Sequence, residues 1–349
     1  MSSTTPWLHN QSLTKYVRND YHVIDNISKR KFPEIKMTRP DVLMIGPYPQ
    51  WDMEPLDQHY NIHKLWTAPD KAALVAGQSD KIRAIATRGE LGANAELIGQ
   101  LPRLEIISCY GVGTDAIDLV TAKSRGIKVT NTPDVLTEDV ADIALGLLIS
   151  VARKIPQADA YVRDGSWRHA NMPLVTRFHG KRLGIIGMGR VGAAVAKRAV
   201  GFDMKVSYFD VRRRDDLNYT CEDSILALAK NSDFLVATVA GGNSTARLID
   251  GKVFEALGPG GYFVNVARGS VVDEPAMLDA LVNSWIAGAG LDVFWNEPNI
   301  DAKFLSLPNV VLQPHHASGT VETRKAMGQL VRDNLAAHFA GQKLLTQVV

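Results

Sequence analysis

The fold of this chain is decided by the stretch Lys181-Arg-Leu-Gly-Ile-Ile-Gly-Met-Gly-Arg-Val-Gly192. Its apolar part, Leu183–Ile186, is typical of a strand buried in a parallel sheet. Three glycines follow in the spacing Gly187-x-Gly189-x-x-Gly192, and the residues after them have the composition of a helix. This order predicts a strand, a tight turn and a helix N-terminus that binds the pyrophosphate of a dinucleotide. In that motif Gly187 makes the turn, Gly189 lets the pyrophosphate approach the backbone, and Gly192 lets the helix pack on the strand.

A second predicted strand, Met204–Phe209, ends at an acidic residue, Asp210. This residue stands about 20 residues after the glycines, where a carboxylate accepts hydrogen bonds from the ribose hydroxyls of a dinucleotide. A glycine turn alone can be purely structural, so the acid is what favours a nicotinamide dinucleotide site. Asp210 would repel the 2′-phosphate of NADPH, whereas the arginines from Arg212 to Arg214 could bind that phosphate. The sequence therefore predicts NAD(H), NADP(H) or both, with a preference for NADH.

The composition is that of an ordinary soluble enzyme with two domains. The chain has 349 residues, of which 46% are hydrophobic and 22% charged, and its formal net charge is +2. That length exceeds what one core usually supports, and the small net charge gives no reason to expect nucleic acid as a partner. The two cysteines have no Cys or His at metal-ligand spacing and fit a reducing compartment. No apolar run is long enough to span a membrane and no secretory signal is visible, so we expect a cytoplasmic protein without a metal site.

Along the chain, apolar strands alternate with helices, which predicts parallel sheets flanked by helices. Residues 1–38 are polar and of mixed charge, and we expect them to form an N-terminal extension. Thr137–Arg153 is predicted to be one helix with Thr137 as N-cap, buried between domains or between subunits because apolar residues nearly surround it. The remaining predictions are strands at 42–45, 82–86, 104–108, 234–239, 262–266 and 310–312, and helices at 71–76, 93–100, 193–200 and 321–339.

Three polar residues follow successive predicted strands of the second sheet, namely Arg268, Glu297 and His315. In doubly wound folds, ligands bind beyond the carboxyl ends of the strands. A nicotinamide cofactor moves hydride, so a carbonyl substrate also needs a proton donor and an anchor. Histidine can donate the proton, a neighbouring carboxylate favours its charged form, and arginine can bind a substrate carboxylate through two hydrogen bonds. Each residue alone could be structural, but their shared position at strand ends favours a catalytic role.

Another loop, Cys109–Asp118, contains two glycines one residue apart after a predicted strand. Exposed backbone N–H groups in such a loop can bind a small carboxylate, although an ordinary turn would have the same sequence.

Taken together, these motifs resemble the D-isomer-specific 2-hydroxyacid dehydrogenase family from about residue 40 to the C-terminus. The matching signatures are Gly111-Val-Gly-Thr-Asp115, Gly187-Met-Gly-Arg-Val-Gly192, Asn265-Val-Ala-Arg-Gly-Ser-Val-Val-Asp273, Gly290-Leu-Asp-Val-Phe-Trp-Asn-Glu-Pro298 and Gln313-Pro-His315. The resemblance implies that the family's catalytic residues are Arg268, Glu297 and His315, whereas His316 is expected to be a packing residue. It also implies that Val112 and Gly113 bind the substrate carboxylate together with Arg268. The cofactor-binding set is then Gly187, Gly189, Arg190, Val191, Gly192, Asp210, Arg212 and Asp292, the last at the nicotinamide amide.

The resemblance further implies an α/β fold of two doubly wound parallel-sheet domains. A flavodoxin-like substrate domain would comprise residues 39–136 and 317–349, and a Rossmann domain, residues 137–316, would be inserted in it. The family is usually homodimeric, and the helix from Thr137 would lie at that interface. No membrane partner is implied.

One segment points to a subfamily. Ala240-Gly-Gly-Asn-Ser-Thr245 is similar to the Gly-Gly variant of glyoxylate/hydroxypyruvate reductases, although Ala240 replaces the proline expected there. The expected reaction is therefore NAD(P)H-dependent reduction of a small 2-keto acid, glyoxylate to glycolate and hydroxypyruvate to D-glycerate. The alternatives are a D-lactate-type or other 2-ketoacid reductase, or a dinucleotide-sensing binding protein of the same fold.

Overall fold

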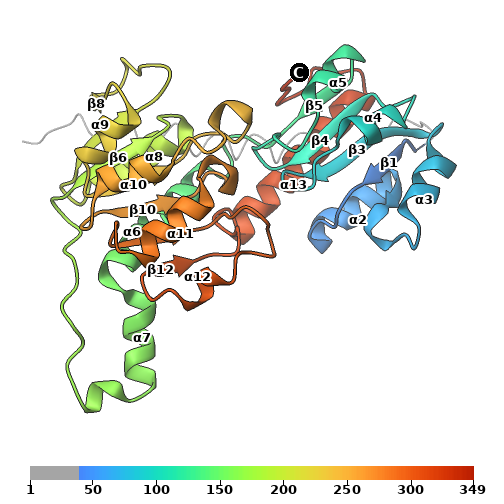
Figure 1. Ribbon diagram of the computed structural model, residues 1–349. Helices are drawn as coiled ribbons and strands as arrows, with labels where there is room; N and C mark the ends of the chain where they lie inside the picture. Colours follow the sequence, from blue (N-terminus) through green and yellow to red (C-terminus); the bar gives the residue numbers. More distant parts are fainter. Residues whose placement is uncertain (1–38) are drawn as a thin grey trace, which may run out of the picture. The chain divides into compact units, whose positions relative to one another are not determined.

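The computed structural model describes residues 39–349 (Figure 1). The predicted N-terminal extension, residues 1–38, lies outside the described residues. Within the described part, the strands form one sheet of five strands and one of seven, and every strand pairing inside these sheets is parallel. The predicted fold class, two parallel-sheet α/β domains, is confirmed.

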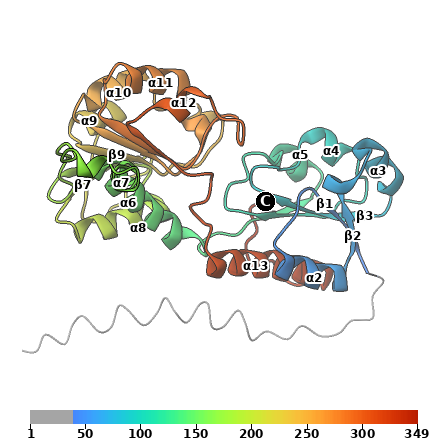
Figure 2. The ribbon, with the colours of Figure 1, turned by 90° about the horizontal axis from the view of Figure 1, so that it is seen from below.

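The first sheet has the strand order β2-β1-β3-β4-β5, which is the flavodoxin-like order. Its strands are β1 (Asp41–Met44), β2 (Asn61–Lys64), β3 (Ile82–Arg88), β4 (Ile106–Tyr110) and β5 (Lys128–Thr130). Figure 2 shows α2 (Gln50–His59) and the C-terminal α13 (Val321–Phe339) on one face of this sheet. The other face carries α3 (Lys71–Gln78), α4 (Ala95–Gly99) and α5 (Leu119–Ser124). The last helix of the chain, α13, thus packs on the sheet formed by residues 41–130.

The second sheet has the order β12-β11-β10-β9-β6-β7-β8, so the direction of the strand order reverses between β6 and β9. That reversal is the ligand-binding position of a Rossmann sheet. The strands are β6 (Arg182–Ile186), β7 (Lys205–Phe209), β8 (Thr220–Cys221), β9 (Phe234–Ala237), β10 (Tyr262–Asn265), β11 (Gly288–Leu291) and β12 (Val310–Leu312). The helices are α6 (Thr137–Arg153), α7 (Ile155–Arg163), α8 (Arg190–Val200), α9 (Ile225–Lys230), α10 (Gly251–Leu257), α11 (Glu274–Val282) and α12 (Lys303–Ser306). Short 3-10 turns are η1 (Leu65–Thr67), η2 (Ser166–Arg168), η3 (Asn243–Thr245) and η4 (Gly269–Val271).

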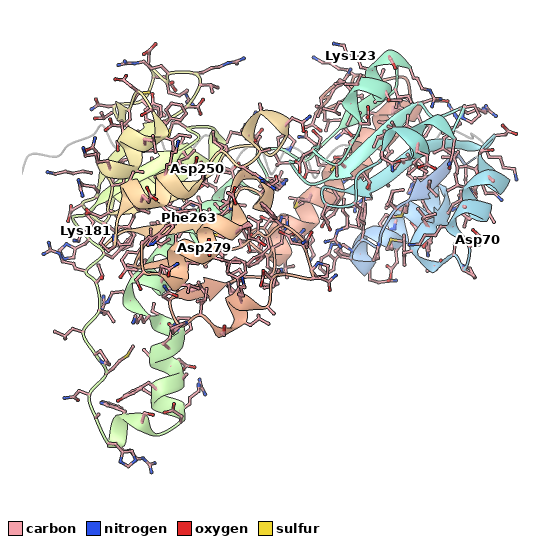
Figure 3. All side chains as sticks on the ribbon, in the orientation of Figure 1. Asp70, Lys123, Lys181, Asp250, Phe263 and Asp279 are labelled. Atoms are coloured by element: carbon pink, nitrogen blue, oxygen red, sulfur yellow. The ribbon has the colours of Figure 1, made fainter. Side chains whose placement is uncertain are left out.

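Apolar packing on both faces of the strands and side-chain capping of the helices explain why these segments fold as they do. Strands β9, β10 and β11 are buried at every position, as expected for parallel strands covered on both faces. Phe263 of β10, labelled in Figure 3, packs edge-to-face on Phe254 of α10, with ring centroids 5.4 Å apart. Asp70 and Asp250 are also labelled there, and their carboxylates accept hydrogen bonds from the free N–H groups at the starts of α3 and α10.

The helix α6 has the predicted bounds, but its predicted N-cap is wrong. Leu136 occupies the cap position and makes no side-chain cap, while the N–H of Thr137 donates to the carbonyl of Asp134. The buried face of α6 packs on the second sheet and on α8, so its apolar character is accounted for within the chain. Helix α8 begins at Arg190 rather than at residue 193. The domain boundaries at residues 137 and 316 remain a prediction.

Candidate active site

The glycine turn after β6 has the shape that a dinucleotide needs. Gly187 has φ +96°, and a Cβ there would lie 2.7 Å from a methyl carbon of Val239, while a Cβ at Gly192 would overlap the Gly187 carbonyl. At Gly189, in contrast, a Cβ would meet no atom within 4 Å. Gly189 is also the N-cap of α8 and offers no side-chain cap, so the first N–H groups of the helix face an open approach. The predicted cofactor-binding residues Arg190 and Val191 supply these groups.

Asp210 lies directly after β7, beside the glycine turn. Its Oδ2 accepts a hydrogen bond from the N–H of Met188 (2.7 Å) and its Oδ1 accepts one from the N–H of Arg212 (3.0 Å). The carboxylate therefore has a fixed position, and each oxygen keeps a further lone pair for another donor.

The three arginines after Asp210 differ in what their guanidinium groups contact. Arg213 pairs with Asp215 (3.1 Å), and Arg214 pairs with Asp216 and donates to a backbone carbonyl. Arg212 is exposed, and its guanidinium has no ion-pair or hydrogen-bond partner within residues 39–349. Of this run, Arg212 is the residue available to bind a phosphate.

His315 and Glu297, which follow the neighbouring strands β12 and β11, lie in contact. The Nδ1 of His315 is 2.6 Å from Oε2 of Glu297, and the other oxygen of that carboxylate accepts the N–H of Phe294 (2.7 Å). Nε2 of His315 has no partner among the described residues, so it is free to face a ligand. Burial alone would raise the pKa of Glu297, but the hydrogen bond and charge of His315 outweigh it and hold this pKa below its usual value. Glu297 is therefore a carboxylate near neutral pH.

Asp292 holds the loop that carries His315. His315 has φ +50°, a conformation that non-glycine residues rarely adopt, and its N–H donates to the Asp292 carbonyl (2.8 Å). The N–H groups of His316 and Ala317 donate to the two carboxylate oxygens of Asp292, at 2.7 and 3.1 Å. Asp292 is buried, and its three hydrogen bonds fix the backbone of the loop. Its expected contact with the nicotinamide stays a prediction.

Arg268 lies just after β10, on a turn shaped by Asn265. The Asn265 side chain accepts the N–H of Ala267 (3.0 Å) and donates to the carbonyl of Arg268 (2.9 Å). The guanidinium donates from Nη1 to the Ala267 carbonyl (2.7 Å) and from Nε to Oδ2 of Asp115 (3.2 Å). Its charge also lowers the pKa of Glu297. The structure therefore brings Arg268, Glu297 and His315 to the ends of three neighbouring strands.

The loop with Val112 and Gly113 carries unused backbone donors beside this arginine. Asn131 donates to the Val112 carbonyl (2.8 Å), but the N–H groups of Val112 and Gly113 have no partner in the described part of the chain. A Cβ at Gly113 would overlap Nη2 of Arg268, so the guanidinium lies against the bare Cα of this glycine. Two free N–H groups next to a guanidinium are the kind of donors that bind a small carboxylate, so this loop is a candidate carboxylate site.

Sequence reasoning missed two residues of this arrangement, Asp115 and Asn265, as partners of Arg268. Both stand in the signatures quoted above, and Asn265 is a polar residue that ends an apolar strand. His316, which we expected to be a packing residue, is instead exposed, and its ring lies against Gly319.

A dinucleotide turn in one sheet, with a histidine–carboxylate pair close to a carboxylate receptor, defines a nicotinamide-dependent oxidoreductase of small organic acids. Comparison with known proteins gives the particular family. The profile described as "D-isomer specific 2-hydroxyacid dehydrogenase, NAD binding domain" matches residues 145–317. The chain is 48% identical over 308 residues to a hydroxyphenylpyruvate reductase of Plectranthus scutellarioides, which spans 88% of this chain and 98% of the relative.

Solved structures agree with this result. A 2-hydroxyacid dehydrogenase of Ketogulonicigenium vulgare is 51% identical, with a TM-score of 0.84 over 90% of this chain and 99% of that one. An NADPH-dependent glyoxylate/hydroxypyruvate reductase of Sinorhizobium meliloti, in complex with NADP and malonate, is 42% identical, with a TM-score of 0.85 over 89% and 97%. The chain belongs to the D-isomer-specific 2-hydroxyacid dehydrogenase family and is an NAD(P)-dependent enzyme. The resemblance inferred from the motifs is confirmed.

Proposed function

We propose that this enzyme reduces glyoxylate to glycolate and hydroxypyruvate to D-glycerate. The observation that carries the proposal is the 2.6 Å contact of His315 with Glu297, which leaves Nε2 of the histidine free near an arginine and two unused N–H groups. A relative of 42% identity that is a glyoxylate/hydroxypyruvate reductase supports the substrate class. A larger 2-keto acid is the second candidate, because a relative of 48% identity is a hydroxyphenylpyruvate reductase.

In the proposed mechanism, substrate binding uses the first sheet and the arginine. The N–H groups of Val112 and Gly113 and the guanidinium of Arg268 bind the keto-acid carboxylate, which orients the adjoining C2 carbonyl. The residues Gly187, Gly189, Arg190, Val191 and Gly192 would hold the dinucleotide at the start of α8. When bound, the reduced nicotinamide supplies the hydride that C2 receives.

Proton transfer depends on His315 and Glu297. Nε2 of protonated His315 donates its proton to the carbonyl oxygen, which becomes the hydroxyl of the product. Oε2 of Glu297 accepts the Nδ1–H, fixes the ring orientation and stabilises the imidazolium before the transfer. The pKa of Glu297 is held low by His315, so the carboxylate does not take the proton itself.

A steady-state screen tests this proposal. We expect turnover of glyoxylate and hydroxypyruvate to exceed that of pyruvate and hydroxyphenylpyruvate in kcat/KM. A reversed order would identify the enzyme as a reductase of other 2-keto acids. If none of these substrates turned over although the dinucleotide bound, the sensing function would be favoured instead.

We further propose that NADH is preferred and NADPH is tolerated. The proposal is supported by the carboxylate of Asp210, which is fixed at the end of β7 and would meet a ribose diol favourably and a 2′-phosphate unfavourably. Tolerance is supported by the unpaired guanidinium of Arg212.

Replacing Arg212 with alanine is expected to lower kcat/KM for NADPH about 10-fold and to leave that for NADH within about twofold. The physical reason is that only the phosphorylated cofactor gains from a free guanidinium. Arg213→Ala is the matched control, because the neighbouring Arg213 already pairs with Asp215. A wild-type enzyme that uses NADPH far better than NADH would contradict the proposed preference.

We also propose that the enzyme is a homodimer whose second copy covers the segment from α7 to β6. Figure 1 shows α7 and the extended chain after it. None of the residues of α7 is buried, and Val162, Trp167 and Leu174 are exposed apolar side chains in and after it. Apolar side chains gathered on one exposed segment are typical of an interface.

The double variant Trp167→Glu/Leu174→Glu is expected to be monomeric at micromolar concentration, whereas the wild type has the mass of a dimer by light scattering. Buried negative charge would oppose association. Val120→Glu on α5, another exposed apolar position, serves as control and should stay dimeric. A monomeric wild type would contradict the proposed dimer.

A further inference from the structure

The guanidinium that is proposed to anchor the substrate is already bound to a carboxylate of the protein. Asp115, two residues after Gly113, accepts the Nε–H of Arg268 at 3.2 Å, and each of the two side chains keeps about a quarter of its surface exposed, 27%. A second anion next to an anion-binding arginine repels a substrate carboxylate, so its presence here calls for an explanation. Asp115 binds the Nε side of the guanidinium and leaves Nη2 to other partners.

Two hydrogen bonds fix the orientation of the guanidinium. Asp115 takes Nε–H, and the carbonyl of Ala267 takes one N–H of Nη1 at 2.7 Å. The remaining nitrogen, Nη2, lies against Gly113, where the unused backbone N–H groups are. The arginine stem is long and flexible, so without these two contacts the planar group would sample other directions.

We propose that Asp115 is a positioning residue for Arg268, which aims Nη2 at the carboxylate site. The proposal rests on the proposed role of Arg268 as substrate anchor. Asp115 touches neither substrate nor cofactor in this scheme, and it acts by holding the arginine ready before substrate binds.

The missing side chain of Gly241 leaves the room for this pair. A Cβ at Gly241 would lie 2.8 Å from Cγ of Arg268 and 3.3 Å from Cγ of Asp115. Gly241 does not have a left-handed backbone conformation, unlike Gly242 with φ +136°, so the backbone does not require glycine there. Gly241 is therefore a packing requirement of the Asp115–Arg268 pair.

The test compares Asp115→Ala with Asp115→Asn, measuring kcat and KM for glyoxylate with NADH. Asp115→Ala is expected to lower kcat/KM about 10-fold to 30-fold, because the anchoring guanidinium loses its orientation. Asp115→Asn is expected to recover most of that loss, because its amide oxygen can still accept Nε–H. The dissociation constant of NADH and the melting temperature should not change in either variant.

A matched control is Asp233→Asn, which removes the charge of another aspartate that is 26% exposed and pairs with an arginine, Arg182, at 2.9 Å. This variant should keep the kinetic constants of the wild type. Gly241→Ala should reproduce part of the Asp115→Ala effect, whereas Gly260→Ala, where a Cβ would meet nothing within 4 Å, should not.

Arg268→Lys separates this inference from the function on which it rests. If Arg268→Lys keeps wild-type kcat/KM, the anchoring role of Arg268 is wrong and the proposed function fails. If that variant loses activity, Asp115→Ala should cost nothing further in its background. The positioning role is overturned if Asp115→Ala alone stays within twofold of the wild type, or if Asp115→Asn loses as much as Asp115→Ala.

Discussion

Replacing His315 with glutamine is expected to lower kcat for glyoxylate reduction at least about 100-fold while the affinity for NADH stays near that of the wild type. Glutamine can still donate a hydrogen bond to the carbonyl oxygen, but it cannot transfer a proton to it. The dinucleotide site at Gly187–Gly192 does not involve this side chain. Single-turnover oxidation of bound NADH, followed by its fluorescence, measures the chemical step directly.

His316→Gln is the matched control for that experiment. The two histidines are adjacent, but the side chain of His316 lies against Gly319 and only its backbone N–H binds Asp292. We expect this variant to keep kcat within about twofold, because the bond from the backbone survives the substitution. Equal losses in the two variants would mean that the loop, not the imidazole of His315, is what matters, and the proton-donor assignment would have to be given up.

The sequence predicts best those elements whose apolar pattern is regular. Helices α6 and α13 and strand β12 have the predicted bounds, since each has an uninterrupted apolar pattern. The edge strand β2, Asn-Ile-His-Lys, has no buried residue, and α7 has none either, so neither leaves a pattern to detect. Helix α2 contains an internal proline and a buried acid, Asp52, both of which hide its periodicity.

The same limit applies to the site. His315 and Glu297 could be paired from the sequence because neighbouring strand ends of one sheet must converge. The contact of Asp115 with Arg268 joins residues 153 positions apart and two different sheets, so no local pattern indicates it. Likewise, the resemblance to the family indicates Asp292 only as a contact of the nicotinamide amide, while its hydrogen bonds to the backbone of the histidine loop depend on the fold.

Replacing Glu297 with glutamine is expected to lower kcat/KM about 30-fold to 100-fold near neutral pH, and less at a pH low enough to protonate the wild-type carboxylate. The hydrogen bond and charge of His315 hold the pKa of Glu297 below its usual value, so the wild-type carboxylate stays ionised well into the acid range. Reduction requires the protonated imidazole, which that negative charge stabilises. A neutral glutamine lacks this charge, so the loss should be present wherever the wild-type carboxylate is ionised and should shrink as the pH falls through its lowered pKa.

The pH dependence separates this electrostatic role from a merely structural one. Glu274 is the suitable control, because its carboxylate also holds the loop between β11 and Glu297, by accepting the N–H of Trp295 (2.9 Å). Glu274→Gln should alter stability more than the pH profile, since no contact joins it to His315. The lowered pKa of Glu297 also affects the stability of the fold. A carboxyl group whose pKa is lower in the folded than in the unfolded chain stabilises the fold above its unfolded-state pKa, and this stabilisation is lost as the pH falls through its folded-state pKa. A loss in Glu297→Gln that stayed constant down to the pH at which the wild-type carboxylate is protonated would show that the carboxylate orients the ring without stabilising its charge.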